Sequence, residues 1–145
     1  MSSVLTRTVA RLLLLPTLMV AIATLVKGYS ETGDGFSAGV IAAVAILLQY
    51  LVFGRRAVRH VLPAAVAPVA VLFGLLVALL VAFVPTVLGE SVLTHMPPPG
   101  RDVISLGTLA VHTAVLFDVA IFGLVFGFVV GVLDRFGAAA EEPRA

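Results

Sequence analysis

Residues 104–133 read ISLGTLAVHTAVLFDVAIFGLVFGFVVGVL, an apolar run with one acidic residue, Asp118, near its middle. A helix from about residue 103 to residue 133 would place Asp118 roughly 22 Å from either helix end. If that helix crosses a membrane, the carboxyl group lies near the midplane, where an ionised acid costs about 3 kcal/mol. The sequence therefore predicts that another group stabilises this carboxylate.

The composition is that of an integral membrane protein. Of the 145 residues, 61% are hydrophobic and 12% are charged, and the mean hydropathy is +1.18. A soluble domain carries about 25% charged residues. This chain has too little polar surface to cover a globule in water.

Several function classes are excluded by what the sequence lacks. It has no cysteine and a net charge of +1, so disulfides, thiolate metal sites and a basic nucleic-acid-binding surface are not expected. It also lacks the short motifs of nucleotide, zinc and nucleophile chemistry. We expect no enzymatic activity, no cofactor, no metal site and no nucleic-acid partner, and we expect the chain to act within a larger assembly.

Four long apolar segments divide the chain, at about residues 9–26, 36–53, 64–88 and 104–133. Each reaches the length of about 18–20 residues that a helix needs to cross the hydrocarbon layer. The predicted fold is an all-α integral membrane protein with four transmembrane helices. Residues 1–145 are expected to form a single membrane domain that ends in a short cytoplasmic tail, 137–145.

The basic residues predict the orientation. Seven of the nine lie before or at the start of the first segment, between the second and third, or after the fourth: Arg7, Arg11, Arg55, Arg56, Arg59, Arg135 and Arg144. Only Lys27 and Arg101 lie in the other two connections. By the positive-inside rule, we expect both termini and the connection at residues 54–60 to be cytoplasmic. That connection is also a candidate contact for anionic lipid.

The first segment allows a second interpretation. Arg7 and Arg11, the apolar run after them and the Ala21-Ile22-Ala23 tripeptide resemble a signal peptide with its cleavage site. The apolar run continues to Val26 and is long enough to span, which favours a helix that is retained. Cleavage would leave three spans in the same orientation.

The connection after the first segment is rich in glycine and small polar residues. Gly33 and Gly35 permit positive φ or close backbone approach, and Asp34 is placed to cap the next helix. Glu31 and Asp34 are therefore open to two interpretations, a capped turn in a solvated loop or an entrance that attracts cations.

Several short segments, in order along the chain, resemble one membrane protein family. The segment GDGFSAG at residues 33–39 resembles a glycine-rich signature, with Phe36 and Gly39 at matching positions. The segment SVLTH at 91–95 and the pair Gly107-Thr108 followed by LFDVAIF at 116–122 resemble two further family segments. On these residues, and on RTVAR at 7–11, the chain resembles the MnhB/MrpB family of small membrane subunits from multisubunit Mrp-type Na⁺/H⁺ antiporters.

The resemblance implies a function without turnover chemistry in this chain. It implies a multi-pass subunit in a prokaryotic cell membrane that works beside the other antiporter subunits and membrane lipid. The transported ions would be Na⁺ and H⁺. Two alternatives stay open: a homologous subunit of a membrane-bound hydrogenase or complex I-related ion pump, and a purely structural scaffold subunit.

The fourth segment holds the candidate ion-path residues. On a regular helix Thr108 and His112 share one face, and Asp118 lies about 120° from His112 and about 9 Å further along the axis. Three hypotheses compete for Asp118: a site on an ion or proton path, a structural pair with a base from another subunit, or a protonated acid bonded to local hydroxyls. We expect the partner of Asp118 to lie on another helix or another chain. His112 is either a proton-path residue or a packed, hydrogen-bonded histidine.

Overall fold

The computed structural model describes residues 3–28, 33–63, 65–94, 105–106, 109–110 and 113–141. Within these ranges the elements follow in the order α1 (Val4–Lys27), α2 (Gly35–Phe53), α3 (Arg55–Val61), α4 (Val66–Val87), β1 (Ser105–Leu106), β2 (Leu109–Ala110) and α5 (Thr113–Glu141). Four of these helices, α1, α2, α4 and α5, are long and apolar enough to cross a membrane. The predicted helical membrane fold with four spans is therefore confirmed.

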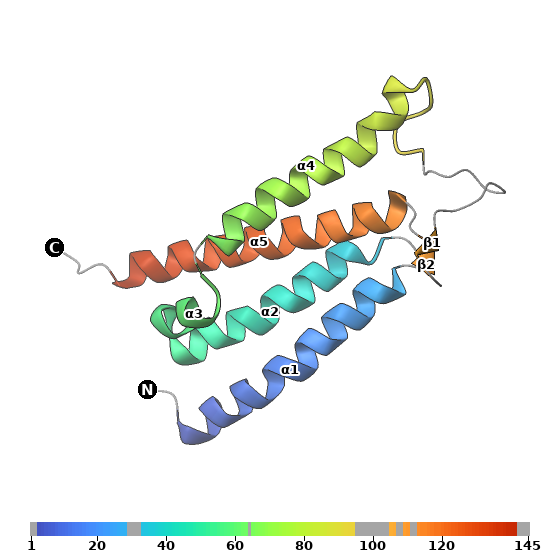
Figure 1. Cartoon of the computed structure of the whole chain (residues 1–145). Helices are drawn as coiled ribbons and strands as arrows, with labels where there is room; N and C mark the ends of the chain where they lie inside the picture. The colour runs from blue at the N-terminus through green and yellow to red at the C-terminus, as the bar shows by residue number, and fades with distance from the viewer. Residues whose placement is uncertain are drawn as a thin grey trace.

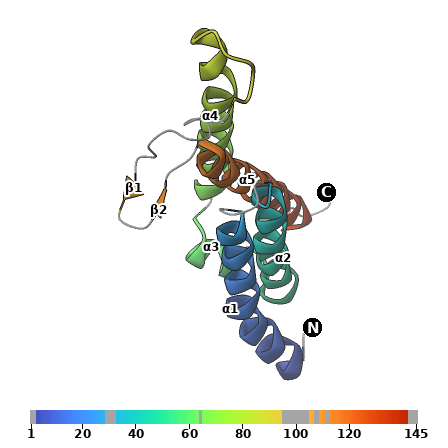
Figure 2. The same cartoon turned by 90° about the vertical axis from the view of Figure 1, so that its right-hand side faces the viewer.

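The four long helices lie side by side in the order α1, α2, α5, α4 (Figures 1 and 2). Helix α5 packs against both α2 and α4, and α1 packs mainly against α2. Helix α1 begins and helix α5 ends at the same end of the bundle as α3, which we call the α3 end (Figure 1). The opposite end, where β1 and β2 lie, is the β1 end.

Small residues form the helix contacts, and large apolar residues point outward. Among the described residues, the buried aliphatic side chains are those of alanines, such as Ala38 and Ala43, and of the two valines Val58 and Val130, whereas Leu72 and Phe73 are each 68% exposed. Small side chains let helix backbones approach closely, and in a membrane the exposed leucines and phenylalanines face lipid. The buried amide of Gln49 donates a 2.9 Å hydrogen bond to the carbonyl oxygen of Ala10, so it joins α2 to α1 as expected for a polar group inside a bundle.

The boundaries of the last helix differ from the prediction. Helices α2 and α4 begin and end close to the predicted spans. Helix α1 begins at Val4 and not at residue 9, and α5 covers Thr113–Glu141 and not residues 104–133. Residues Ser105–Leu106 and Leu109–Ala110 form a short antiparallel pair, with Ser105 opposite Ala110. The helix prediction was wrong for these residues and for the tail up to Glu141.

Local sequence accounts for both differences. Between residues 104 and 113 the chain carries Gly107 and three hydroxyl residues, which disfavour a helix because glycine is flexible and hydroxyls compete for backbone hydrogen bonds. At the other end, residues 138–140 are all alanine, the residue type with the highest helix propensity. The helix is therefore shifted towards the C-terminus relative to the apolar run.

Candidate functional site

The shift of α5 moves Asp118 away from the middle of its helix. Because α5 begins at Thr113, Asp118 lies in its second turn, at the β1 end of the bundle. Its side chain is nevertheless buried, with 4% of the residue exposed. The predicted burial is confirmed, and the predicted mid-helix position is wrong.

The buried carboxylate is bound by the backbone of its own chain. The N–H group of Gly33 donates to both carboxylate oxygens of Asp118, at 3.2 Å to Oδ1 and 3.0 Å to Oδ2. Gly33 has a φ of +119°, a conformation that residues with a side chain rarely adopt. In the described structure the donor is a backbone group of the connection between α1 and α2 and not a side chain of another helix. A partner on another chain stays a prediction.

Glycines allow this connection to come so close to α5. A Cβ atom on Gly35, the first residue of α2, would overlap the backbone carbonyl of Asp118, and one on Gly28 would lie 2.9 Å from Asp118 Oδ2. The carboxylate therefore lies between the end of α1 and the start of α2. The start of α2 also carries the positive end of the helix dipole, which favours a carboxylate nearby.

Other charged groups lie beside this carboxylate. Lys27 Nζ is 3.5 Å from Asp34 Oδ2. The Cβ atom of Asp34 and Oδ2 of Asp118 both lie within 3.3 Å of the position that a Cβ atom on Gly28 would take. Two acids and one lysine are thus gathered around Gly28, and we call Lys27, Gly33, Asp34 and Asp118 the carboxylate site.

The remaining predicted residues are only partly placed. Gly39 packs against α5, since a Cβ atom there would lie 3.0 Å from the carbonyl oxygen of Phe122, and Phe36 is 60% exposed. Glu31, Thr108 and His112 lie outside the described residues. Of the predicted site, the structure brings together Asp118 with Gly33, Asp34 and Gly35, two segments that are far apart in the sequence.

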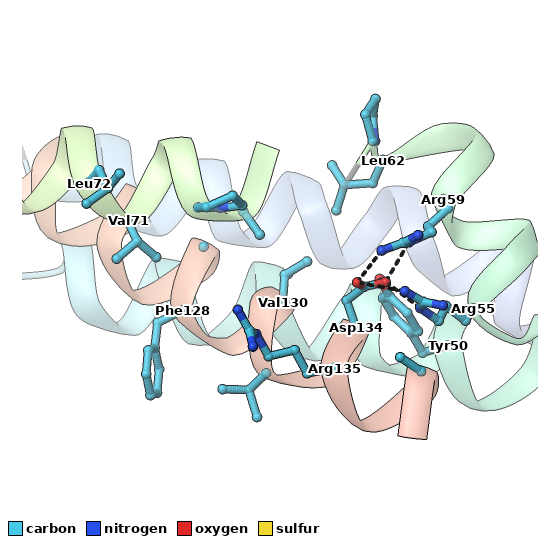
Figure 3. A pocket seen from close by; sticks show the side chains of 17 residues that line it. Tyr50, Arg55, Arg59, Leu62, Val71, Leu72, Phe128, Val130, Asp134 and Arg135 are labelled. Carbon is cyan, nitrogen blue, oxygen red and sulfur yellow. Dashed lines mark hydrogen bonds and ion pairs between the residues drawn. The ribbon is translucent and has the colours of Figure 1, made fainter. Parts of the chain in front are cut away.

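A second charged cluster, at the α3 end, was not predicted. Asp134 of α5 accepts hydrogen bonds from Arg59 (Nη2, 2.7 Å; Nε, 2.9 Å) and Arg55 (Nε, 3.0 Å), and the Tyr50 hydroxyl lies 3.4 Å away (Figure 3). Hydrogen bonding to Asp134 raises the pKa of both guanidinium groups above its usual value. Glu141 adds a contact of 3.5 Å to Arg55. We call these five residues the Asp134 cluster; it ties α3 to α5.

Known proteins resemble this chain over most of its length. Residues 5–131 match a family model described as a domain related to the MnhB subunit of Na⁺/H⁺ antiporter. The B subunit of a Na⁺/H⁺ antiporter from Bacillus subtilis (strain 168) is 32% identical over 111 residues, which cover 77% of this chain and 76% of that protein. The corresponding B subunit from Alkalihalophilus pseudofirmus is 29% identical over 132 residues (91% and 90% of the two chains). A putative antiporter subunit mnhB2 of Staphylococcus aureus (strain MRSA252) is 30% identical over 132 residues (91% and 92%).

Proposed function

Because this chain belongs to the MnhB family, we propose that it is a membrane subunit of a multisubunit Na⁺/H⁺ antiporter in a prokaryotic cell membrane. The relatives that are named as antiporter B subunits match it over most of both chains. The four apolar helices supply the membrane part of such a protein. The chain would work beside other antiporter subunits, with Na⁺ and H⁺ as transported ions and without chemistry or a cofactor of its own.

We propose that Asp118 serves this function by holding the connection between α1 and α2 against α5. The observation that carries the proposal is the pair of hydrogen bonds from Gly33 to the buried carboxylate. Leaving a buried donor without its partner costs about 1–3 kcal/mol. The carboxylate would therefore fix the shape of the β1 end, where Lys27 and Asp34 also lie.

Substitutions of Asp118 test this role. Asp118→Asn keeps one side-chain oxygen that accepts the Gly33 N–H, and Asp118→Ala keeps none. We expect the asparagine variant to assemble and to retain at least about a third of the Na⁺-dependent proton flux. For the alanine variant, the amount of this subunit that co-purifies with the complex is expected to fall about tenfold. This fall corresponds to a loss of about 1.4 kcal/mol in the free energy of assembly. Flux is measured in everted vesicles with a pH-sensitive dye, and assembly by co-purification of the other subunits.

The control is Glu90→Gln, which removes an exposed acid that follows α4 and should leave flux and assembly unchanged. If Asp118→Asn assembles normally but has no flux, the carboxyl group lies on the ion or proton path, and the holding role is wrong. If Asp118→Ala assembles and transports like the wild type, neither role applies.

We also propose that the α3 end and both termini are cytoplasmic. The basis is the distribution of arginine and lysine, which favours the α3 end by seven to two. The carboxylate site would then face the outside of the cell. In an antiporter, that side exchanges ions with the external medium.

Cysteine labelling tests this orientation, and the chain has no cysteine of its own. Glu90→Cys places a thiol at the β1 end and Ala140→Cys places one at the α3 end, both at exposed residues. We expect a membrane-impermeant maleimide to label residue 90 in intact cells and residue 140 only after permeabilisation. The opposite pattern would reverse the proposed orientation.

A further inference from the structure

A pocket of about 630 Å³ opens beside the Asp134 cluster, and we call it the α3-end pocket. Its walls come from the end of α2, from α3 and the connection to α4, from the first turns of α4 and from the second half of α5 (Figure 3). Its volume lies in the range of about 300–1,000 Å³ that is typical of ligand pockets.

The charged part of the pocket carries an excess of arginine. Arg55, Arg59 and Arg135 line it together with a single acid, Asp134. Arg55 and Arg59 share that acid, and Arg135 has no ion pair within the described residues. The side chain of Arg59 is also 38% exposed. Arg59 donates hydrogen bonds from its Nε and Nη2 groups to Asp134. Its Nη1 group and the guanidinium group of Arg135 are therefore left to bind a further anion.

The rest of the pocket is apolar and continues along the helices. Leu72 of α4 and Phe128 of α5 line it and are 68% and 61% exposed. The arginines lie where the apolar helices end, which is the depth of lipid headgroups in a membrane. The pocket thus joins a cationic part at headgroup depth to an apolar part at the depth of acyl chains.

We propose that the α3-end pocket binds an anionic phospholipid, with its phosphate at Arg59 and Arg135 and an acyl chain along Leu72 and Phe128. Arginine binds phosphate through paired N–H donors, and Arg135 supplies them because no described residue forms an ion pair with it. A helix from a neighbouring subunit would fill the apolar part only, and it would leave the charge of Arg135 without a counter-ion. An anionic lipid satisfies both parts with one molecule.

Lipid binding is measured by native mass spectrometry of the full-length chain, purified in detergent with the subunits that co-purify. Phosphatidylglycerol and phosphatidylcholine with the same acyl chains are titrated in turn. We expect phosphatidylglycerol to bind more tightly, and Arg135→Gln to weaken it about fivefold, since one arginine attracts an anionic lipid with about 1 kcal/mol. The control is Arg56→Gln, which removes the same charge from an arginine of α3 that does not line the pocket.

A second pair of variants tests the apolar part. Gly131 lines the pocket, and a Cβ atom there would meet only Ala67, at 3.6 Å. Gly123 faces α4 in the same way, with Ala70 at 3.7 Å, but does not line the pocket. We expect Gly131→Leu to reduce bound phosphatidylglycerol more than fivefold and Gly123→Leu to leave it unchanged.

Three results would overturn the proposal. Equal affinity for the two lipids would exclude recognition of the anionic headgroup. Equal losses of affinity for phosphatidylglycerol in Arg135→Gln and Arg56→Gln would show that the lipid is attracted by the general surface charge and not by the pocket. A helix of another subunit found in the pocket of the assembled complex would exclude a lipid there. None of these results bears on the proposed transport function, which rests on the flux measurements.

Discussion

Replacing Gly35 with alanine is expected to force α2 and α5 apart at the β1 end and to remove most of the subunit from its complex. The Cβ atom would overlap the backbone of Asp118, and backbone, unlike a flexible side chain, cannot turn aside. Overpacking of this kind costs about 1–3 kcal/mol, which implies a loss of assembled subunit of about fivefold or more. The displacement would also pull Gly33 away from the Asp118 carboxylate. Quantitative co-purification and the melting temperature of the purified complex measure the effect.

Gly123→Ala is the matched control for that variant. Gly123 also lies at a helix contact, but a Cβ atom there would have only the carbonyl oxygen of Ala70 nearby, at 3.7 Å. Alanine favours a helix over glycine by about 1 kcal/mol, so this variant should melt at the same temperature as the wild type or higher. If Gly35→Ala behaves like Gly123→Ala, the close contact between α2 and α5 does not stabilise the protein.

Replacing Asp134 with asparagine is expected to release α3 from α5. The carboxylate accepts hydrogen bonds from both Arg55 and Arg59, and without its charge the two guanidinium groups repel each other. The side chain of Arg55 is only 19% exposed, so water compensates poorly for the lost partner. We expect the melting temperature to fall by about 4 °C or more. Added salt should restore little of this loss, because salt only weakly screens the repulsion between partly buried guanidinium groups.

Glu141→Gln separates this effect from general surface charge. Glu141 contacts Arg55 at 3.5 Å and Arg56 at 4.0 Å, and its side chain is 39% exposed. Ion pairs at such an exposed position contribute little to stability. Its loss should therefore change the melting temperature much less than Asp134→Asn does. Equal shifts in the two variants would show that the Asp134 cluster is not a specific contact.

The spans that rest on hydropathy alone could be predicted closely. The segments at 9–26, 36–53 and 64–88 correspond to α1, α2 and α4, since length and apolar composition are enough to define a helix in a membrane. The same criterion failed at residues 105–106 and 109–110, because leucine and alanine are apolar whether they lie in a strand or in a helix. There the presence of glycine and hydroxyl residues is a better guide to the structure than hydropathy.

The contacts of the buried acid could not be predicted in the same way. Asp118 could be recognised as buried from its apolar neighbours, but its partner is a backbone N–H 85 residues earlier, and a backbone donor has no side-chain signature. The glycine-rich connection was the available signal, since successive backbone N–H groups in such turns bind anions. The contacts of Asp134 could not be predicted either. In the sequence, the arginines of α3 predict the orientation in the membrane, but nothing in their spacing shows that they pair with an acid at the end of a distant apolar run.

The position of α5 between α2 and α4 has a consequence for biogenesis. Within the described ranges α4 contacts no helix other than α5. During synthesis, α1 and α2 can pair as soon as both are in the membrane, whereas α4 has to wait in lipid until the last helix has been inserted. Tertiary structure is therefore completed only after translation of α5. Before then, the nascent chain exposes the small-residue faces of α2 and α4 to other membrane proteins and to quality-control proteases.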